Sequence, residues 1–468
     1  MARQNKFLFN NMLKKKHIKF FERLLPKDYI YSEPGDCWAY GYDNSKIHVM
    51  PECVLFAENK TQVQEIVKYC YLNNIPITSR GRGTGNTGGS VPIDNSIVLS
   101  LEKMNEVIEI DIENRLAIVQ PGVINKTLQD SLKKINFFWG PDPSSLDYST
   151  IGGNIANNSA GPRAIKYGTP RDNILGLEFV SGTGDLHKTG VKTSKGVVGL
   201  DLTRIFIGSE GVLGILTEAT LKILPLNDSI KTIEITFDNI DDASQCIINL
   251  MTQPIAPYKL EFIDKESIKL INTIKKNHYD KNTNSAVLLE IDGQSEYIGF
   301  MLEKILKVIK ENNHKRITIA EDTSEIDKLW AARKSLSPAL RELGGYKINE
   351  DIVVPISKLK EFLKSLERIS KKYNIKIVNF GHAGNGNIHV NLLFETEEEK
   401  KSENSKKCLD EIFNLVIKLE GTLSGEHGIG VIKKQYIKKE IDKNTLKLMQ
   451  DIKKQFDPKN ILNPNKSI

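Results

Sequence analysis

Short runs of apolar residues separated by glycine-rich turns dominate the first half of the chain, and they predict strands more often than helices. In one segment Val63, Ile66, Val67 and Cys70 recur at i, i+3, i+4 and i+7, a spacing typical of an amphipathic helix that starts near Thr61. Strands are predicted over residues 51–58, 75–80, 97–101, 115–120 and 215–224, and a hairpin over 177–187.

After Pro225 strand-like and helix-like runs alternate, which indicates an α/β or antiparallel α+β domain. Strands are predicted over 232–237, 286–291 and 317–320, and helices over 297–310, 326–340 and 443–456. The predicted organisation is a basic N-terminal segment (1–29), a glycine-rich domain (30–225), a second domain (226–420) and a C-terminal segment (421–468) that returns to one of them.

The composition is that of a soluble globular protein, with 40% hydrophobic and 26% charged residues in 468. It excludes a disordered, collagen-like or disulfide-scaffold chain. The net charge of +6 comes from lysines spread along the chain rather than gathered on one element. We therefore expect a solvated lysine-rich surface and no nucleic-acid partner.

Three features of the sequence indicate where in the cell the protein is expected. No run of 18 apolar residues occurs, and the first 21 residues lack the pattern of a secretory signal. Five scattered cysteines without a Cys-x-x-Cys pair are typical of reduced thiols, and they lack the clustering that an iron–sulfur cluster needs. We expect a cytoplasmic protein whose mild basicity is compatible with peripheral binding at the inner face of a membrane.

The segment from Gly81 to Gly89 contains five glycines. Its part Gly83-Thr-Gly-Asn-Thr-Gly88 matches G-x-G-x-x-G, but an extended apolar run follows instead of the helix that a dinucleotide-binding βαβ unit needs. Consecutive backbone N–H groups in such a loop can bind an anion. The alternative is an ordinary surface loop. Because 151–161 is a second Gly/Asn-rich region, we expect two loops that bind one long phosphate-bearing ligand.

Three of the eight histidines lie in glycine-rich turns. His382 and His389 flank one turn, and Glu426 directly precedes His427 in another. Two histidines and a glutamate suit a divalent metal with open coordination positions, and His427 would be free to act as an acid or base. His382 alone is more simply explained as a solvated or core histidine at a turn, but the set of three together with Glu426 favours a site.

Arg333 lies on a predicted helix close to Lys334 and Ser337. A lone arginine is usually a surface residue. A guanidinium is nevertheless the group that binds a carboxylate with two parallel hydrogen bonds. Both roles stay open from the residues alone.

Together these segments resemble the FAD-linked oxidase family, which includes D-lactate dehydrogenases, D-2-hydroxyglutarate dehydrogenases and the FAD subunit of glycolate oxidase. The resemblance implies an α+β fold, in which a two-part FAD-binding domain of the vanillyl-alcohol-oxidase type is interrupted by an α/β substrate cap domain and rejoined by the C-terminal tail. It covers about residues 49–464 and rests on Pro76-x-x-x-Arg80-Gly-x-Gly-Thr-Gly, Ile151-Gly-Gly-Asn154, Gly208-Ser-Glu-Gly-x-Leu-Gly214, the Gly381–His389 turn, Gly425-Glu-His-Gly428 and Leu462-Asn-Pro464.

The resemblance implies that four segments bind FAD. The first holds the pyrophosphate, the second lines the flavin and ribityl chain, the third lies near the adenosine half, and the fourth reaches the isoalloxazine. The first loop contains no histidine that could tether FAD, so the cofactor is expected to be non-covalent. In the same order the residues are Arg80, Gly81, Arg82, Gly83, Thr84, Gly85, Asn86, Gly88 and Gly89; Ser149, Gly152, Gly153, Asn154, Asn158 and Ala160; Glu210, Gly214 and Ile215; and Asn463.

In the cap the resemblance implies a divalent metal (Zn, Mn or Fe) with the substrate beside it. The acidic residue usual in the family's Gly-His-x-Gly-Asp-Gly-Asn turn is Asn385 here, which puts the support of the ligands in doubt. The implied roles are metal binding for His382, His389 and Glu426, catalysis for His427 and Arg333, and substrate contact for Arg333, Ser337 and Asn391.

The implied reaction is the metal-assisted oxidation of a D-2-hydroxy acid to the 2-oxo acid, with hydride transfer to FAD. D-lactate is the first candidate substrate, and glycolate and D-2-hydroxyglutarate are the alternatives. A FAD transferase of the alkyl-glycerone-phosphate synthase type would resemble this chain in fold but carries a run of consecutive histidines that is missing here. A non-catalytic electron-carrying subunit is disfavoured by Glu426 and His427.

The implied partners are the small acid and an electron acceptor. The acceptor could be a quinone, a cytochrome, an electron-transfer flavoprotein or an iron–sulfur subunit. A dimer is compatible with the sequence, which does not decide it.

Overall fold

The computed structural model describes residues 13–276, 278–342 and 345–468, and these form two compact units. Unit 1 comprises the described residues up to Ala160 together with Gly168–Leu226 and Glu426–Ile468. Unit 2 comprises Gly161–Tyr167 and Asn227–Gly425. The short segment 161–167, which we had expected in the glycine-rich domain, belongs to unit 2. Residues 1–12 of the expected basic N-terminal segment lie outside the described residues.

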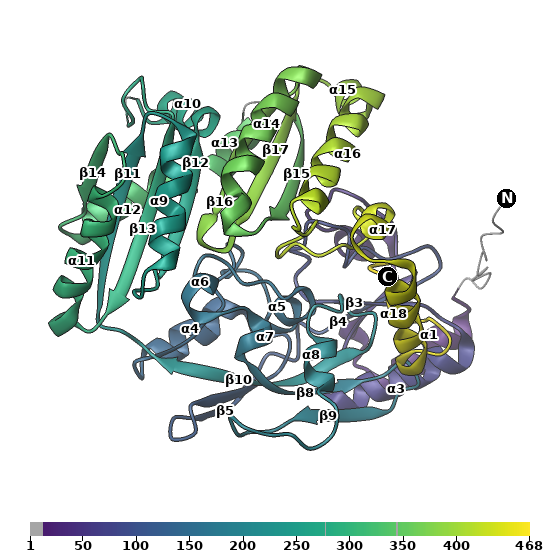
Figure 1. Cartoon of the computed structure of the whole chain (residues 1–468). Coiled ribbons are helices and arrows are strands. Elements are labelled where there is room, and N and C mark those ends of the chain that lie inside the picture. Colours follow the sequence, from purple (N-terminus) through teal and green to yellow (C-terminus); the bar gives the residue numbers. More distant parts are fainter. Residues whose placement is uncertain (1–12, 277, 343–344) are drawn as a thin grey trace. The chain divides into compact units, whose positions relative to one another are not determined.

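A four-stranded sheet in the order β1-β2-β4-β3 carries the first glycine-rich loop of unit 1. Its strands β3 and β4 are labelled in Figure 1. Strands β2 and β3 pair parallel to β4, and β1 pairs antiparallel to β2. Helix α3 connects β2 to β3 and buries the four apolar residues that predicted it. Because β3 ends at Arg80, the loop begins at the carboxyl end of a parallel strand. The elements are β1 (Ile30–Tyr31), β2 (Cys53–Phe56), α3 (Lys60–Asn73), β3 (Ile77–Arg80) and β4 (Ile97–Ser100).

An antiparallel sheet in the order β5-β6-β10-β8-β9, with β7 paired to β10, completes the framework of unit 1. The hairpin predicted over 177–187 is confirmed as β8 and β9, and the strand predicted over 215–224 as β10. The elements are β5 (Val107–Asp111), β6 (Leu116–Val119), β7 (Phe137–Trp139), β8 (Ile174–Val180), β9 (Leu186–Gly190) and β10 (Ile215–Pro225).

The second Gly/Asn-rich region is not a loop, so that expectation is wrong. Residues Ile151–Asn157 form helix α5 despite two glycines. Thr150 caps its first turn by accepting a hydrogen bond from the Gly153 N–H at 3.1 Å, and Asn158 ends it in a left-handed conformation. These caps satisfy terminal backbone groups and offset the weak helix propensity of glycine.

The remaining helices of unit 1 are short except at the two ends of its sequence. The tail helix predicted over 443–456 is confirmed as α18. After it, Ile461 and Leu462 lie in the same buried cluster as Ile77, and the Ile77 N–H donates to the Ile461 carbonyl at 2.7 Å. The helices are α1 (Lys15–Leu24), α2 (Pro34–Cys37), α4 (Asn125–Lys133), α7 (Pro170–Asn173), α8 (Leu202–Phe206), α17 (Ile437–Glu440) and α18 (Lys443–Phe456), with 3-10 turns η1 (Lys27–Tyr29), η2 (Trp38–Tyr40) and η5 (Lys434–Tyr436).

Unit 2 is built on a seven-stranded antiparallel sheet in the order β14-β11-β13-β12-β16-β17-β15. The antiparallel character and the strands predicted over 232–237, 286–291 and 317–320 are confirmed. The strands are β11 (Ser229–Phe237), β12 (Lys259–Asp264), β13 (Ser285–Gly293), β14 (Arg316–Ile319), β15 (Tyr346–Val353), β16 (Lys376–His382) and β17 (Asn387–Phe394).

Helices pack against this sheet. The continuous helix predicted over 326–340 is wrong in one respect: it divides at Ser335 into α12 and α13. Pro338 explains the break, since it cannot donate to the carbonyl of Lys334. The helices are α6 (Ala164–Tyr167), α9 (Ile240–Thr252), α10 (Lys265–Ile274), α11 (Ser295–Lys310), α12 (Thr323–Lys334), α13 (Leu336–Glu342), α14 (Leu359–Tyr373), α15 (Glu397–Lys401) and α16 (Glu403–Lys418), with 3-10 turns η3 (Ile356–Lys358) and η4 (Ala383–Asn385).

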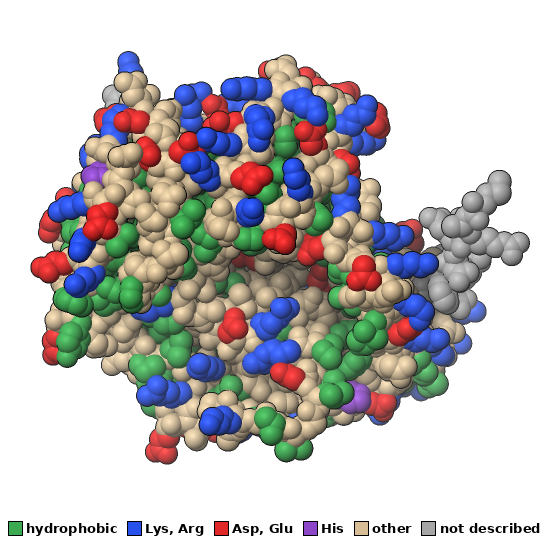
Figure 2. Space-filling view, in the orientation of Figure 1, with side chains coloured by type: hydrophobic (Ala, Val, Ile, Leu, Met, Phe, Trp, Pro, Cys, Tyr) green, Lys and Arg blue, Asp and Glu red, His purple; other side chains and the backbone are tan. Residues whose placement is uncertain are grey.

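Lysine and arginine side chains are interspersed with acidic ones on the face drawn in Figure 2, without a stripe of one sign. Within the described ranges, no helix has both the length and the apolar character needed to cross a bilayer. All five cysteines are buried free thiols, and burial raises their pKa, to about 12 for Cys246.

Candidate cofactor and metal sites

The first glycine-rich loop directs its polar backbone groups in two different ways. Its carbonyl oxygens accept hydrogen bonds from unit 1: Thr84 from the Asn44 side chain at 3.0 Å, Gly85 from the Asn44 N–H at 2.9 Å, and Thr87 from the Val431 N–H at 2.8 Å. The N–H groups of residues 82–89 donate to no described residue. A row of unused N–H donors is the arrangement that binds an anion such as a pyrophosphate.

Conformation and packing explain why glycine is required in this loop. Gly83 has φ +65°, and a Cβ there would collide with the guanidinium of Arg80. At Gly81 a Cβ would collide with Thr150 Oγ1, so the loop lies directly against the residue that caps α5. The two glycine-rich regions predicted to share a ligand are therefore adjacent in unit 1.

The two arginines of the loop differ. Arg80 is buried, its Nη1 lies 3.4 Å from the Ser90 carbonyl, and its Nε has no hydrogen-bond partner among the described residues. Burial lowers its pKa, an effect that Asp43 and Glu102 oppose. Arg82 is half exposed and pairs with Glu102. Of these two arginines, only Arg80 therefore has an unused donor in a buried position.

The residues expected to line the flavin mostly serve the structure around α5. A Cβ on Gly152 would contact Pro121 at 2.7 Å, and Asn154 accepts from the Asn125 side chain at 2.9 Å. Ser149 differs, because its buried Oγ has no partner in the described part of the chain. The Gly153 N–H donates the capping hydrogen bond to Thr150. The Asn158 side chain accepts a hydrogen bond from the Arg171 N–H at 3.0 Å, and the Ala160 carbonyl accepts one from the Asp142 N–H at 2.7 Å.

Glu210 is buried, and its carboxylate bonds to the backbone of another segment of unit 1. Its carboxylate accepts from the Ile429 N–H at 2.9 Å and the Gly430 N–H at 2.7 Å, so it fixes the segment that follows His427. Burial raises its pKa, against the effect of these hydrogen bonds. Gly214 and Ile215 lie in the hydrophobic core, where a Cβ on Gly214 would contact Phe179 at 2.8 Å. Their part in FAD binding stays a prediction.

The C-terminal tail forms hydrogen bonds with the glycine-rich loop. The Asn463 side chain donates to the Gly89 carbonyl at 3.2 Å and the Glu210 carbonyl at 2.6 Å. Lys466, 2% exposed, donates to the same Gly89 carbonyl and to Asn463 Oδ1, both at 3.0 Å. Burial lowers the pKa of Lys466 to about 7. The side chain of Asn463 thus supports the loop, and its predicted contact with the isoalloxazine stays a prediction.

The residues of unit 1 fit a long anionic ligand. Unused N–H donors lie along 82–89, and the buried Arg80 Nε and Ser149 Oγ have no partner among the described residues. Buried polar groups without partners are uncommon in folded proteins, and bound ligands are one way in which they are satisfied.

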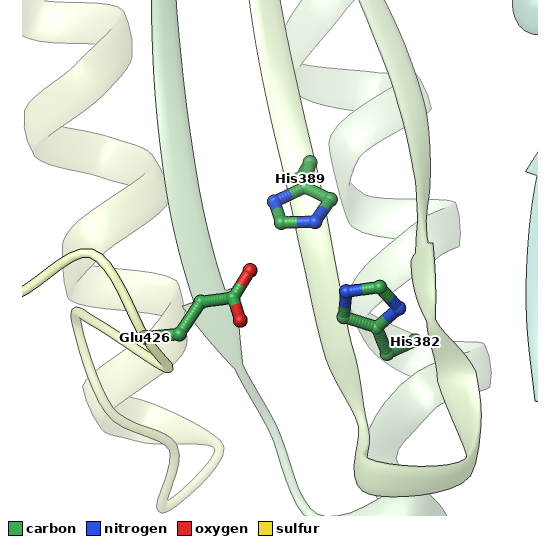
Figure 3. Close-up of side chains that lie close together, drawn as sticks. All are labelled: His382, His389 and Glu426. Atoms are coloured by element: carbon green, nitrogen blue, oxygen red, sulfur yellow. The ribbon is translucent and has the colours of Figure 1, made fainter. Parts of the chain in front are cut away.

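Three side chains that the sequence singled out form one group in the structure. One ligand atom each from His382, His389 and Glu426 lies within 4.8 Å of the other two. Figure 3 shows the carboxylate of Glu426 directed toward the two imidazoles. Glu426 directly follows Gly425, the last residue of unit 2, so one peptide bond separates it from that unit. Two imidazole nitrogens and a carboxylate oxygen suit Zn²⁺, Mn²⁺ or Fe²⁺.

The register of the sheet of unit 2 brings the two histidines together. His389 on β17 pairs with Phe380 on β16, two residues before His382 and on the same face. Residues two apart in a strand share a face, and diagonal neighbours are within reach of long side chains. The imidazole rings accordingly lie 5.3 Å apart and nearly perpendicular.

A buried carboxylate that the sequence analysis did not single out connects two predicted site residues. Glu261 accepts hydrogen bonds from His382 Nδ1 and, at 2.8 Å, from Arg333 Nε, and Arg333 Nη2 forms an ion pair with the same oxygen, also at 2.8 Å. Burial alone would raise the pKa of Glu261, but the neighbouring His382 and Arg333 hold it well below its usual range. Arg333 also lies over the Phe380 ring, 4.5 Å from its centre. The structure therefore brings Arg333 to the histidines through Glu261.

A second buried carboxylate lies behind the other histidine. Asp351 is paired across the sheet with His389, and its Oδ1 lies 3.9 Å from Nδ1 of that ring. It also accepts hydrogen bonds from the Gly425 N–H at 2.8 Å and from Asn387 Nδ2 at 2.7 Å. Asp351 thus fixes the residue directly before Glu426.

The other predicted substrate residues are less clearly placed. Ser337 is exposed on α13. Asn391 is buried between strands, where its amide donates to the Val378 and His389 carbonyls and accepts from Asn349. Substrate contact by either residue stays a prediction. Asn385 is exposed in η4, with no side-chain hydrogen bond to a described residue, and so gives the two histidines no buried support.

His427 lies in the segment of unit 1 that begins at Glu426. The Thr87 hydroxyl donates to its carbonyl at 3.1 Å, and Ser159 donates to the Glu426 carbonyl at 3.4 Å. The backbone of the predicted base is therefore tied to the glycine-rich loop and to the segment after α5.

Comparison with known families agrees with this geometry. A model described as "FAD binding domain" matches residues 51–190, and one described as "FAD linked oxidases, C-terminal domain" matches residues 226–467. The chain belongs to the FAD-linked oxidase family. It therefore carries an FAD-binding domain and is an oxidoreductase by family, as its sequence motifs predicted.

Two curated relatives cover nearly the whole chain. Glycolate oxidase subunit GlcD of Bacillus subtilis (strain 168) is 39% identical over 428 residues, which is 91% of this chain and 91% of that protein. D-lactate dehydrogenase of Anaerostipes hadrus is 32% identical over 462 residues, 96% of each chain. Both names agree with the predicted class of enzyme.

Solved structures share the fold at low identity. p-Cresol methylhydroxylase with substrate bound has a TM-score of 0.78 at 20% identity and covers 97% of this chain and 96% of that one. Alkyldihydroxyacetonephosphate synthase has a TM-score of 0.75 at 18% identity and covers 100% and 87%. At such identities the likeness concerns the fold alone, and it confirms the predicted α+β, vanillyl-alcohol-oxidase-type architecture.

Sequence reasoning missed Glu261, Asp351 and Lys466. Glu261 is the acid in Leu260-Glu-Phe-Ile263, an otherwise apolar strand, and this was a usable signal, since a buried carboxylate needs partners. Asp351 and Lys466 lie in polar sequence, where nothing distinguishes them from exposed residues.

Proposed function

We propose that this chain is an FAD-dependent dehydrogenase that oxidises a short 2-hydroxy acid, D-lactate or glycolate, to the 2-oxo acid. The observation that carries the proposal is the group of His382, His389 and Glu426, linked through Glu261 to Arg333. An ion site beside a guanidinium suits a substrate that has a hydroxyl next to a carboxylate. The curated relatives named glycolate oxidase subunit and D-lactate dehydrogenase support the choice of acids.

When bound, FAD supplies the acceptor for the hydride from C2 and a divalent cation supplies a Lewis acid for the substrate hydroxyl. His382, His389 and Glu426 are the residues that would hold the cation. Arg333 holds the substrate carboxylate through Nη1, because Nε donates to Glu261 and Nη2 forms an ion pair with the same carboxylate. His427 takes the hydroxyl proton on a ring nitrogen.

The glycine-rich loop of unit 1 would hold the FAD pyrophosphate through its unused N–H groups. Non-covalent attachment, cytoplasmic location, peripheral membrane binding and dimer formation stay predictions. So does the nature of the electron acceptor, whether quinone, cytochrome, electron-transfer flavoprotein or iron–sulfur subunit.

The test is anaerobic mixing of the purified flavoprotein with D-lactate, L-lactate, glycolate and D-2-hydroxyglutarate, read by the flavin absorbance. We expect bleaching by D-lactate or glycolate, suppressed by prior treatment with a chelator and restored by Zn²⁺ or Mn²⁺. Retention of the absorbance with all four acids would contradict the proposal and favour a transferase or an electron-carrying subunit. Bleaching by D-2-hydroxyglutarate alone would mean that this acid is the substrate instead of D-lactate or glycolate, and the proposed reaction would still hold.

A further inference from the structure

One buried carboxylate in unit 2 contacts a candidate metal ligand and the candidate substrate arginine at the same time. Glu261 is 1% exposed, with one oxygen bonded to His382 and the other to Arg333. We propose that Glu261 is a positioning residue that couples metal binding to recognition of the substrate carboxylate. The inference rests on the proposed function and assigns a role to a residue that makes no contact with the substrate itself.

The register of the sheet fixes the contact with the histidine. Glu261 on β12 and His382 on β16 are directly paired across the two antiparallel strands. A carboxylate on Nδ1 holds the proton there and leaves Nε2 as the metal-binding nitrogen. The ring is thereby oriented before an ion arrives, which lowers the entropic cost of binding.

The contact with the arginine decides which edge of the guanidinium is used. Nε donates to one oxygen of Glu261 at 2.8 Å, Nη2 forms an ion pair with the same oxygen at 2.8 Å, and the guanidinium carbon lies over the Phe380 ring. The end that carries Nη1 remains for an anion. With the Arg333 side chain 11% exposed, few other orientations are open to it. Glu261 therefore limits how a carboxylate can approach.

Charge couples the two contacts. A buried guanidinium without its carboxylate would be costly, and a carboxylate facing His382 and Arg333 is satisfied only when both are present. In Glu261→Gln the single amide oxygen can accept from one of them, while the amide NH₂ faces the donor of the other. The substitution keeps the shape of the side chain but must disturb the metal ligand, the substrate arginine or both.

Asp351 provides a matched comparison. It is paired with His389 across the sheet as Glu261 is with His382, its Oδ1 lies 3.9 Å from Nδ1 of that ring, and it accepts a hydrogen bond from the Gly425 backbone N–H. Asp351→Asn should therefore weaken metal binding without changing recognition of the carboxylate. Glu234→Gln is a control outside the site, since Glu234 is a buried carboxylate of β11 bonded to the Tyr279 hydroxyl.

The experiment titrates Zn²⁺ into chelator-treated, FAD-loaded protein by calorimetry and records the absorption spectrum of the Co²⁺ form. For Glu261→Gln we expect a 10- to 100-fold weaker Zn²⁺ affinity, about the loss usual for a partner behind a metal-bound histidine. The Co²⁺ spectrum should change as well. At saturating metal the KM for the acid should rise about 10-fold, the loss that corresponds to one charge-assisted hydrogen bond.

Glu261→Asp keeps the negative charge on a shorter side chain and should recover part of the Zn²⁺ affinity and part of the KM. Such a partial recovery would show that the effects of Glu261→Gln do not come from poor folding. Asp351→Asn should lower the Zn²⁺ affinity and leave the KM for the acid unchanged. Glu234→Gln should change neither the Zn²⁺ affinity nor the KM. Wild-type affinity and KM in a folded Glu261→Gln protein would overturn the inference. A wild-type protein that binds no divalent cation would instead contradict the metal in the proposed function.

Discussion

The candidate FAD site in unit 1 uses backbone groups, whereas the candidate metal site uses side chains. In unit 1 the loop 82–89 presents backbone N–H groups, while its carbonyls are bonded to the protein. In unit 2 the two candidate histidine ligands are side chains on the paired strands β16 and β17, next to the buried carboxylates of Glu261 and Asp351. A backbone site depends on conformations that few residues other than glycine adopt readily, whereas a side-chain site depends on strand register and on satisfied partners.

This difference teaches which substitutions should separate the two functions. Loss of a side chain near the histidines should stop turnover and leave the flavin bound. A methyl group added to the glycine-rich loop should release the flavin and leave metal binding intact. The predictions below test that separation, from the largest expected effect to the smallest.

His389→Ala should remove one of the three ligands and lower kcat/KM by about 10³-fold or more, since the Lewis acid contributes several kcal/mol at the transition state. The flavin absorbance should stay. Metal content and kcat/KM are the measurements. His314→Ala is the control, because His314 is exposed and, among the described residues, is hydrogen-bonded only to Asn312 of its own turn. Loss of the flavin in His389→Ala would break the proposed separation.

His427→Ala should lower kcat by about 10²- to 10⁴-fold, the usual contribution of a general base, with flavin and metal retained. Steady-state kinetics together with flavin and metal content check this. His427 directly follows Glu426, where unit 1 resumes, so this variant also tests whether His427 acts through its side chain or only through its backbone. Unchanged kcat would remove His427 from the chemistry.

Gly83→Ala should weaken FAD binding by at least about 10-fold, because a side chain at φ +65° is strained and its Cβ collides with Arg80. Gly35→Ala is the control, as nothing lies within 4 Å of its added Cβ. Titration of FAD into the apoprotein gives the affinity, and Zn²⁺ titration should show no change. Equal FAD affinities in the two variants would contradict a backbone site.

Lys466 should make the stability of the FAD-free protein depend on pH. Its pKa is about 7 in the folded chain and near 10.4 in the unfolded chain, so the unfolded state binds more protons between these values. Stability contributed by this group should rise with pH above about 7, by about 2.6 kcal/mol between pH 6 and 9, or about 3 °C in Tm for a chain of this length.

The measurement is the Tm of the wild type minus that of Lys466→Met at several pH values. The difference should become more favourable to the wild type as pH rises. A flat difference would mean that the buried ammonium keeps its proton through its bonds to the Gly89 carbonyl and to Asn463.

Much of the fold could be predicted from the sequence, because local patterns decide it. The period of apolar residues predicted α3 and α18, and the glycine content between Gly81 and Gly89 predicted a loop without a following helix. The prediction of a loop at 151–161 was wrong because the caps at Thr150 and Asn158 outweigh two glycines. The unbroken helix over 326–340 was wrong because of Pro338.

The candidate metal ligands were also chosen from the sequence, as histidines and a glutamate in glycine-rich turns are unusual enough to stand out. That choice needed no distances. The residues behind them could not be chosen in this way. Glu261 precedes His382 by 121 residues, and only the pairing of β12 with β16 brings them into contact.

The sequence by itself determined which residues are chemically capable and which segments must be strands, helices or glycine turns, because these properties act over a few residues. The tertiary structure decided which capable residues share a face, which charges are buried, and which donors remain without partners. Strand register and burial are long-range properties, and one residue of slip in β16 would turn His382 away from Glu261.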